Sequence, residues 1–365
     1  MTQRIVIVGG GIAGLSTAWF LAHAGAQDVV VVERERELGT QSTAQNASIL
    51  RTAIDDAPTR ALARIGARFL AAPPSGFTDR ALVSGDGLLI LGGENPGWDD
   101  GASGAQRVDG ARAGELFPAL GERRRGGWFF AEEGRVDVPA LVHGFADGAR
   151  ALGVRFETGR RVARIRAGGR GVELEDGTRL EADQTVLAAG AWAGPLGRAV
   201  GSHVELTPTR RHLLVTQRDA GVEPRWPVMW SDEDEFYARA EDGGWMLCAC
   251  DGDAIEPDHL VASAAVLESI HAKAHAVLRR AQVPPAAKFW AGSRTHARDK
   301  RFVLGRDPHV PALVWAAGLG GHGITCAAAI GDVVARAVLG REIPPEIAAA
   351  CSPARFASAP AGSKV

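Results

Sequence analysis

The chain has 365 residues, carries a formal net charge of −2 and is 46% hydrophobic. This length allows two or three domain-sized units with a full hydrophobic core. The charge argues against a nucleic-acid-binding protein, whose affinity would depend on a basic surface. No apolar stretch approaches the roughly 20 residues that a membrane span requires, and the amino terminus does not have the pattern of a signal peptide. We therefore expect a cytoplasmic protein without a membrane span.

Cysteine and histidine spacing gives no metal motif. The four cysteines form no CxxC pair, which fits a reducing compartment. His271 and His275 lie four residues apart in a helical pattern. Because no third ligand lies near them in the sequence, we expect no metal site.

The most informative stretch is the first dozen residues. Residues 5–8 are apolar and β-branched, and the glycine-rich run GGGIAG follows at once. This order predicts a buried parallel strand that turns into a helix at a diphosphate-binding loop. Gly9 allows the tight turn, Gly11 lets a diphosphate approach the backbone, and Gly14 lets the helix pack closely on the strand. The free N–H groups and the positive end of the helix dipole then face the phosphates.

The next elements complete a dinucleotide-binding unit. We expect a helix over residues 15–24, a second strand over 29–32 and a carboxylate, Glu33, at the end of that strand. An acid in this place accepts hydrogen bonds from ribose hydroxyls. Strand, glycine motif, helix, strand and acid stand in the correct order, so the pattern is much more specific than the glycines alone.

Two kinds of pattern alternate along the rest of the chain. An α/β pattern is interrupted near residue 77, returns at 139, and is interrupted again between 208 and 285. In chain order we expect a polar binding loop over 39–48, a helix over 57–72, a strand over 88–91, a helix over 140–152 and a strand over 154–157. Antiparallel strands are expected over 161–165, 172–175 and 179–181, and a buried strand ending in small residues over 184–192. Further strands are expected over 211–216, 235–239 and 245–250, and a helix over 262–281.

The last section carries a second glycine-rich loop. A buried strand expected over residues 313–316 leads into the loop at 318–323 and then into a helix expected over 324–339. The loop opens onto a helix amino terminus, where N–H groups and the dipole favour negative charge. Its glycine spacing differs from that of the first motif, so we do not expect a second dinucleotide site.

The pattern as a whole is that of an α/β protein with an α+β second domain. We expect a Rossmann-like cofactor-binding domain with a parallel central sheet, made of residues 1–76, 139–200 and 290–365. Residues 77–138 and 201–289 would then form a substrate-binding domain around an antiparallel sheet.

Taken together, the motifs resemble the flavin-dependent amine oxidoreductases of the D-amino-acid oxidase (DAO) superfamily. Within this superfamily the chain is most similar to bacterial D-arginine dehydrogenases along nearly its whole length, and the segment 226–237 supports that closer likeness. The set is specific because its members are scattered over most of the chain in the family's order. They are the glycine motif at 9–14, Glu33, the pair Ser42-Thr43, the run LAAGAW at 187–192, the run AGSR at 291–294 and the run GGHGI at 320–324.

The resemblance implies FAD, bound non-covalently and in an extended form. The diphosphate would lie at the first glycine motif, the adenosine ribose at Glu33 and the adenine near the backbone of Val162. Ser42, Thr43 and the second glycine loop would hold the flavin end. The cofactor-binding residues implied are Gly9, Gly11, Ile12, Ala13, Gly14, Glu33, Arg34, Ser42, Thr43, Val162, Ala189, Gly190, Trp192, Gly320, Gly321, Gly323 and Ile324.

Three residues match family positions around the reacting part of the substrate. Arg211 and Arg294 fall where relatives use arginines to bind the substrate carboxylate, and a guanidinium binds a carboxylate in a bidentate manner. Tyr237, the only tyrosine of the chain, matches an active-site tyrosine. The resemblance implies that these three are the catalytic residues. The structural alternatives are salt bridges for the two arginines and core packing for the tyrosine.

The rest of the substrate pocket departs from the family pattern. We expect it to include Ile49, Arg51, Leu88, Gly321 and His322. Ile49 replaces a histidine beside the flavin, and Leu88 replaces the acid that binds a cationic side chain. We therefore expect that the substrate is not cationic. If Arg51 points away from the pocket, apolar side chains are preferred, and if it points inward, a substrate with a second acidic group fits better.

The resemblance implies an FAD-dependent enzyme that oxidises the C–N bond of a D-amino acid or related amine by hydride transfer, giving an imine and then a keto acid. One alternative is oxidation of a secondary amine of the glycine or sarcosine type, or of the C–O bond of a hydroxy acid. A second alternative is a flavoprotein subunit that is active only with a partner. The electron acceptor stays open among a quinone, a carrier protein and O2, and the oligomeric state between monomer and homodimer.

Overall fold

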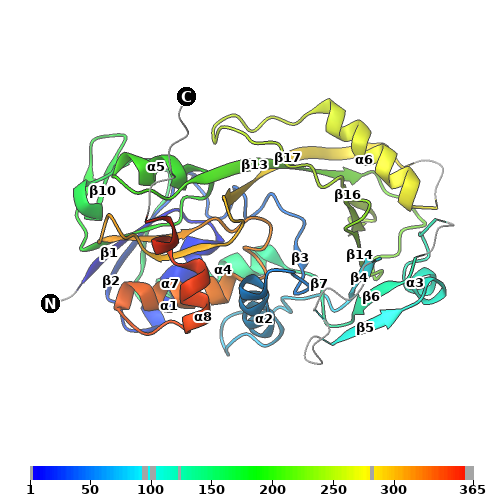
Figure 1. Ribbon diagram of the computed structural model, residues 1–365, viewed down its shortest axis with the longest axis horizontal. Helices are drawn as coiled ribbons and strands as arrows, with labels where there is room; N and C mark the ends of the chain where they lie inside the picture. The colour runs from blue at the N-terminus through cyan, green and yellow to red at the C-terminus, as the bar shows by residue number, and fades with distance from the viewer. Residues whose placement is uncertain (1–2, 93–97, 99–103, 122–124, 280–282, 358–365) are drawn as a thin grey trace.

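The computed structural model describes residues 3–92, 98, 104–121, 125–279 and 283–357. Two large sheets, one of six strands and one of eight, organise these residues. Figure 1 shows the two sheets toward opposite ends of the molecule, with the long strands β13 (Leu206–Thr216) and β17 (Ala286–Ala297) running between them. In the described part of the chain, no helix has the length and hydropathy that crossing a membrane demands.

The six-stranded sheet is the expected Rossmann-like sheet. Every neighbouring pair of its strands is parallel except β18·β19. Along the central strand β1, Ile5 and Ile7 pack into one apolar cluster and Val6 and Val8 into another. Both faces are therefore buried, which explains the continuous apolar runs that predicted these strands. In spatial order the strands are β18 (Val303–Arg306), β19 (Leu313–Ala317), β12 (Gln184–Leu187), β1 (Arg4–Val8), β2 (Asp28–Val32) and β8 (Arg155–Glu157).

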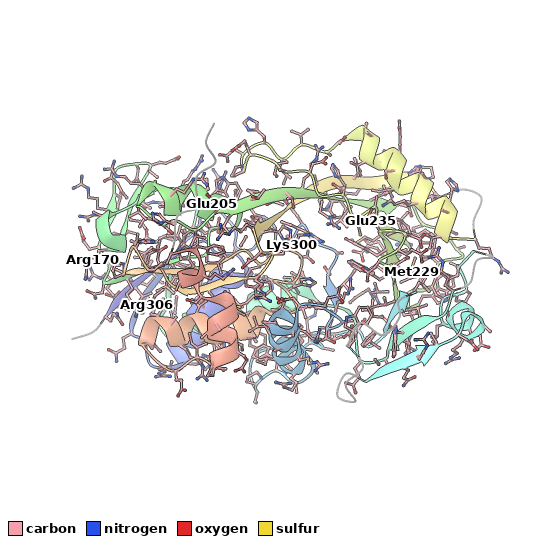
Figure 2. All side chains as sticks on the ribbon, viewed as in Figure 1. Arg170, Glu205, Met229, Glu235, Lys300 and Arg306 are labelled. Carbon is pink, nitrogen blue, oxygen red and sulfur yellow. The ribbon has the colours of Figure 1, made fainter. Side chains whose placement is uncertain are left out.

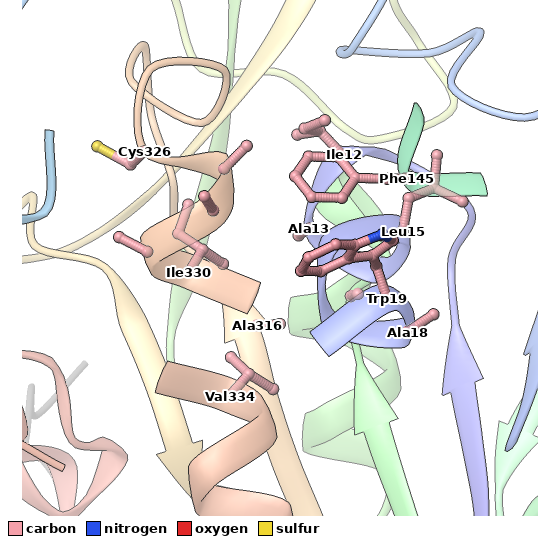
Figure 3. Packing of buried hydrophobic residues seen from close by; sticks show 14 of the residues in the cluster. Ile12, Ala13, Leu15, Ala18, Trp19, Phe145, Ala316, Cys326, Ile330 and Val334 are labelled. Carbon is pink, nitrogen blue, oxygen red and sulfur yellow. The ribbon is translucent and has the colours of Figure 1, made fainter. Parts of the chain in front are cut away.

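Helices cover one face of this sheet. α1 (Ile12–His23) packs between α4 (Val138–Ala151) and α7 (Ala327–Leu339), and α2 (Ala57–Ala71) and α8 (Pro345–Cys351) lie outside them. Figure 3 shows the facing sides of α1 and α7 with the residues that pack around them. A Cβ at Gly331 would lie 2.7 Å from the Ser16 backbone, so glycine is needed for this close helix crossing.

The opposite face is covered by a small antiparallel sheet and a short helix. The sheet has the order β11-β10-β9, and its turn at residues 167–169 is a 3₁₀ element, η1 (Ala167–Gly169). These elements are β9 (Val162–Ile165), β10 (Val172–Leu174), β11 (Arg179–Leu180), η2 (Gly190–Trp192) and α5 (Ala193–Ala199). A last 3₁₀ element, η3 (Pro353–Phe356), packs against β18.

The eight-stranded sheet has one outer and one inner face. The outer face packs against α6 (Ala264–Val277) and α3 (Gly110–Leu116), and Met229, labelled in Figure 2, belongs to this layer. The inner face carries Tyr237 and Cys248, which are paired across neighbouring strands. In spatial order the strands are β17, β13, β16 (Gly244–Cys248), β15 (Phe236–Glu241), β14 (Val228–Ser231), β4 (Leu88–Leu91), β6 (Gly127–Phe130) and β5 (Ala105–Val108).

Three expectations need correction. The second sheet is mixed, because β4 and β14 come from distant segments and pair in parallel. The first helix begins at Ile12, inside the glycine motif, and α7 begins at Ala327, after a turn that occupies residues 323–326. The predicted domain boundary at 289/290 falls inside the continuous strand β17. The division into two domains stays a prediction, and its end segments 1–2 and 358–365 lie outside the described residues.

Candidate active site

A cavity of about 710 Å³ lies at the carboxyl ends of β1, β12 and β19 and extends to the inner face of the eight-stranded sheet. Ligands of open α/β sheets bind at this edge, and the volume suits an organic ligand. Its walls come from the first glycine motif, the loop 39–51, strands β13 and β17, and the second glycine loop. The short ladder β3 (Ile49–Leu50) with β7 (Gly134–Arg135) lies at one end of the loop 39–51.

The first glycine motif forms a tight turn at one end of this cavity. Gly9 has φ +111°, and a Cβ there would collide with the carbonyl oxygen of Ala188 at the end of β12. A Cβ at Gly14 would collide with the carbonyl oxygen of Gly9. The close packing of strand and helix therefore requires both glycines. Gly14 permits this packing but does not itself line the cavity.

The amino terminus of α1 faces the cavity as an anion-binding site. Gly11 is the N-cap, and the N–H of Ile12 donates to Thr43 Oγ1 at 3.0 Å. Ala13, which also lines the cavity, lies in the first turn, where N–H groups have no carbonyl one turn earlier to bond. Together with the helix dipole, these groups suit a diphosphate.

Glu33 lies at the end of β2 and is only 7% exposed. Its Oε2 accepts the N–H of Gly10 at 2.6 Å and its Oε1 accepts the N–H of Glu35 at 2.8 Å. Burial raises the pKa of this carboxyl, and the two backbone donors oppose that rise. Each oxygen keeps a further lone pair, so the side chain can accept hydrogen bonds from ribose hydroxyls in the cavity.

A segment between β16 and α6 closes the same end of the cavity. Its Asp258 accepts a hydrogen bond from Trp192 Nε1 at 2.9 Å and pairs with Arg34 at 3.3 Å. The Arg34 guanidinium lies 4.3 Å from the centre of the Trp192 ring. Sequence reasoning identified Arg34 and Trp192 but missed Asp258, because no local motif marks a residue that reaches the site from the other sheet. Val162, Ala189 and Gly190 line this end as well.

The second glycine loop lies at the other end. Gly320 has φ +52°, and a Cβ there would lie 2.6 Å from the His296 ring. A Cβ at Gly321 would lie 2.8 Å from Arg294 Nη1. Gly323 and Ile324 also line the cavity, but Ala327, where α7 begins, does not. The loop residues, rather than the first turn of α7, therefore line the cavity.

Arg211 and Arg294 lie on the facing strands β13 and β17. Arg211 is paired with Gly292, two residues before Arg294, so both side chains leave the same face of the ribbon. Within the described part of the chain, no ion pair involves either guanidinium. Arg211 Nε and Tyr237 Oη are buried and have no hydrogen-bond partner among the described residues. Unpaired buried polar atoms are costly, so this cluster is suited to a ligand that has a carboxylate.

Burial keeps three titratable groups of this region, His322, His296 and Tyr237, in their uncharged forms. Burial, and then Arg51 and Arg294, lower the pKa of His322 to about 3. Burial, Arg294 and Arg211 lower the pKa of His296 to about 4. Burial raises the pKa of Tyr237 well above its usual value, which leaves its O–H as a donor. His296 was not identified from the sequence, since a single histidine on a strand carries no motif.

The structure brings Ile49, Arg51 and His322 to the cavity but does not place Leu88 in the cavity wall. Leu88 lies on β4, is 0% exposed and packs with Trp128 and Phe130 in a separate apolar cluster. Arg51 lines the cavity, which favours the inward orientation of the two left open for it.

The cavity fits FAD and a small acid together. Ser42 and Thr43 line it, and Gln45 Oε1 and Ser293 Oγ add two more buried polar atoms without partners among the described residues. At one end of the cavity lie a glycine turn, a helix amino terminus and an acid suited to bind ribose. At the other end lie two arginines that form no ion pair with the described residues. Fold and site thus define an enzyme that binds a dinucleotide cofactor.

Comparisons with known proteins identify the family. The family model described as "FAD dependent oxidoreductase" (DAO) matches residues 4–337, so the chain belongs to this family and uses FAD as its cofactor. The glycine oxidase of Bacillus licheniformis is 26% identical over 375 residues, which cover 93% of this chain and 94% of that protein. The resemblance to the DAO superfamily is thereby confirmed, whereas the closer likeness to D-arginine dehydrogenases stays a prediction.

Solved structures share the fold. The glycine oxidase of Bacillus cereus superposes with a TM-score of 0.80 at 20% identity, covering 94% of this chain and 99% of that one. The L-proline dehydrogenase of P. horikoshii gives a TM-score of 0.81 at 20% identity and covers 98% of each chain. The expected fold class, a Rossmann-like FAD domain with a second sheet domain, is confirmed.

Proposed function

We propose that this FAD-dependent oxidoreductase oxidises the C–N bond of a small amino acid at the carbon that bears both the amine and the carboxylate. The observation that carries the proposal is the cluster of Arg211, Arg294 and Tyr237, which faces the cavity without an internal acidic partner. A substrate carboxylate supplies the missing acceptor. The relative from Bacillus licheniformis, a glycine oxidase, supports an amino acid rather than another acid.

The chain's own residues position the substrate. Bidentate contacts from Arg211 and Arg294 and a hydrogen bond from Tyr237 fix the carboxylate, which leaves the neighbouring C–H with one orientation. Bound FAD supplies the hydride acceptor, and the product imine is hydrolysed by water to a keto acid. His296 and His322 stay neutral at physiological pH, so each can accept a hydrogen bond from the substrate amine.

The test is anaerobic reduction of the bound flavin, followed as loss of its visible absorbance. Amino acids of both chiralities, secondary amines of the glycine and sarcosine type and 2-hydroxy acids form the panel. Bleaching by an amine but not by the matching hydroxy acid supports the proposal. Bleaching by hydroxy acids alone would replace C–N by C–O oxidation. A yellow protein that no member of the panel reduces would favour a subunit that needs a partner, and reoxidation by O2, a quinone or a carrier protein would identify the acceptor.

A further inference from the structure

The end of the cavity beyond the carboxylate receptor contains a third arginine. Arg51 follows β3, and its backbone N–H donates to Thr325 Oγ1 at 3.4 Å, which ties this segment to the turn after the second glycine loop. Its side chain lines the cavity and is only 13% exposed. Burial, and then Arg51 and Arg294, lower the pKa of His322, which also lines the cavity.

A stack of three side chains holds Arg51 in this place. The Trp230 ring lies 4.6 Å from the Tyr237 ring, with planes inclined by 15°. The Arg51 guanidinium lies 4.4 Å from the centre of the same Trp230 ring. The Trp230 ring thus contacts both Tyr237 and Arg51. A substrate side chain that reaches this end of the cavity meets the guanidinium of Arg51 beside that ring.

Arg51 keeps binding capacity although it has partners. Its Nε donates to the carbonyl oxygen of Ala53 at 2.9 Å, and its two Nη atoms contact the Asp232 carboxylate at 3.0 and 3.5 Å. A guanidinium has five N–H donors, so two remain. The Asp232 side chain is 56% exposed, and ion pairs with such exposed groups are weak. The pair with Asp232 therefore leaves Arg51 able to bind a second, better enclosed carboxylate.

The charges along the cavity wall show what the substrate must supply. At the substrate end the wall carries three arginines and, among the described lining residues, no acid. All described acids of the wall lie at the adenosine end, where Asp258 and Glu175 pair with arginines of that end and Glu33 binds backbone N–H groups. The acids of the wall are Glu33, Glu175, Glu256 and Asp258.

We propose that the substrate is an amino acid with a second acidic group, and that Arg51 is the residue that selects it. Arg211 and Arg294 bind the carboxylate next to the amine, and Arg51 binds the distal one over the edge of Trp230. Both a dicarboxylic amino acid and a secondary amine with a carboxylate on each arm have this chemistry. The inference rests on the proposed function and adds the substrate class to it.

The test compares pairs of compounds with and without a distal carboxylate. Glutamate and glutamine of both chiralities, and iminodiacetate and sarcosine, are offered to the FAD-loaded enzyme under anaerobic conditions. We expect the wild-type enzyme to favour the diacid in kcat/KM by on the order of 100-fold, and Arg51→Met to reduce this ratio at least tenfold. Arg51→Lys should retain part of this kcat/KM preference, because lysine keeps the positive charge but lacks the bidentate geometry of the guanidinium.

A matched control is Arg155→Met. Arg155 is 63% exposed, pairs with Asp28 at 2.9 Å and lies on β8 away from the cavity. This variant also loses one guanidinium from an exposed ion pair, so it should leave the diacid preference unchanged. Equal loss of preference in both variants would indicate a general effect of net charge and would overturn the role of Arg51.

A second measurement separates the two proposals. Glutarate has two carboxylates and no amine, so its equilibrium binding, followed by the shift of the flavin spectrum, requires no turnover. If glutarate binds more tightly than butyrate and Arg51→Met abolishes the difference, the distal site is supported. This holds even if no amine reduces the flavin, because failure of all amines would contradict only the proposed C–N oxidation. Efficient reduction by sarcosine or glutamine with no preference for their diacid partners would overturn the distal site and leave the C–N oxidation standing.

Discussion

Replacing Arg294 by Met tests the carboxylate receptor most directly. Methionine keeps much of the apolar stem and removes the guanidinium. In the described structure Arg294 has no acidic partner, so the substitution leaves no buried carboxylate unpaired. Arg294 also stands close to His296, whose pKa is held down by burial and then by this arginine. His296 is already neutral at physiological pH, so the substitution removes no ion pair and leaves no charge unpaired, and we expect the free energy of unfolding to stay nearly the same.

The effect on catalysis should be large. Truncating one member of a desolvated, charge-assisted pair costs about 2–5 kcal/mol, which corresponds to a loss of about 30- to 5,000-fold in kcat/KM. Arg211 and Tyr237 keep part of the receptor, so the lower half of that range is expected. The affinity for FAD should change by less than about threefold, because the diphosphate and ribose groups lie at the other end of the cavity.

The assay measures two quantities on the same protein. Anaerobic stopped-flow reduction gives the dependence on substrate concentration, and titration of apoprotein with FAD gives the cofactor affinity. Arg294→Lys is the matched control, since it keeps the charge without the bidentate geometry and should fall between Met and Arg. A folded, yellow Arg294→Met protein with unchanged KM and kcat would refute the assignment, and a parallel loss of FAD would move Arg294 to the cofactor site.

Three further outcomes test other parts of the structure. Acid precipitation of the purified protein should release the yellow colour into solution, and colour that stays in the pellet would mean a covalent flavin. Gly9→Ala should abolish FAD retention, because the new Cβ collides with the Ala188 carbonyl, whereas Gly25→Ala, at φ +91° with no atom within 4 Å, should keep it; equal FAD content in the two variants would contradict this. Burial raises the pKa of Glu133 from 4.5 to about 7, so the folded state binds more protons than the unfolded state between these values and stability falls as pH rises through them. Glu133→Gln keeps the acceptor for Thr52. Its free energy of unfolding should therefore rise relative to that of the wild type from pH 5 to 7.5, by up to about 3 kcal/mol. A difference in denaturant unfolding that does not depend on pH would argue against the raised pKa of Glu133.

Much of the cofactor end could be predicted from the sequence because its information is local. The strand, the glycines and the helix of the first motif follow one another without a gap, and each residue type has a steric reason to be there. Gly9 and Gly14 prove this in the structure, where a Cβ at either position collides with backbone. Glu33 could be placed because it directly follows a strand parallel to β1.

The substrate end could be predicted only in part, because its information is not local. Arg51 and Asp232 are 181 positions apart, and the same difficulty hid Asp258 at the adenosine end, 66 positions from Trp192. No periodicity indicates that such residues meet. The parallel pairing of β4 with β14 also joins segments that are far apart in the sequence. This pairing buries Leu88 in a separate apolar cluster. A family position carried over by motif gives the strand on which a residue lies, but not the depth of its side chain in the sheet.

The expectation that the substrate is not cationic now has a different physical basis. From the sequence it depended on Leu88 in place of an acid, yet Leu88 does not reach the cavity. In the structure the same expectation follows from Arg51, Arg211 and Arg294, which make the substrate end positive without a described acid in its wall. A missing attraction would only weaken binding of D-arginine or D-lysine, whereas three positive charges actively repel them. Raising the ionic strength should therefore reduce the association rate of acidic substrates and leave that of uncharged ones nearly constant, a dependence that an apolar, Leu88-lined pocket would not produce.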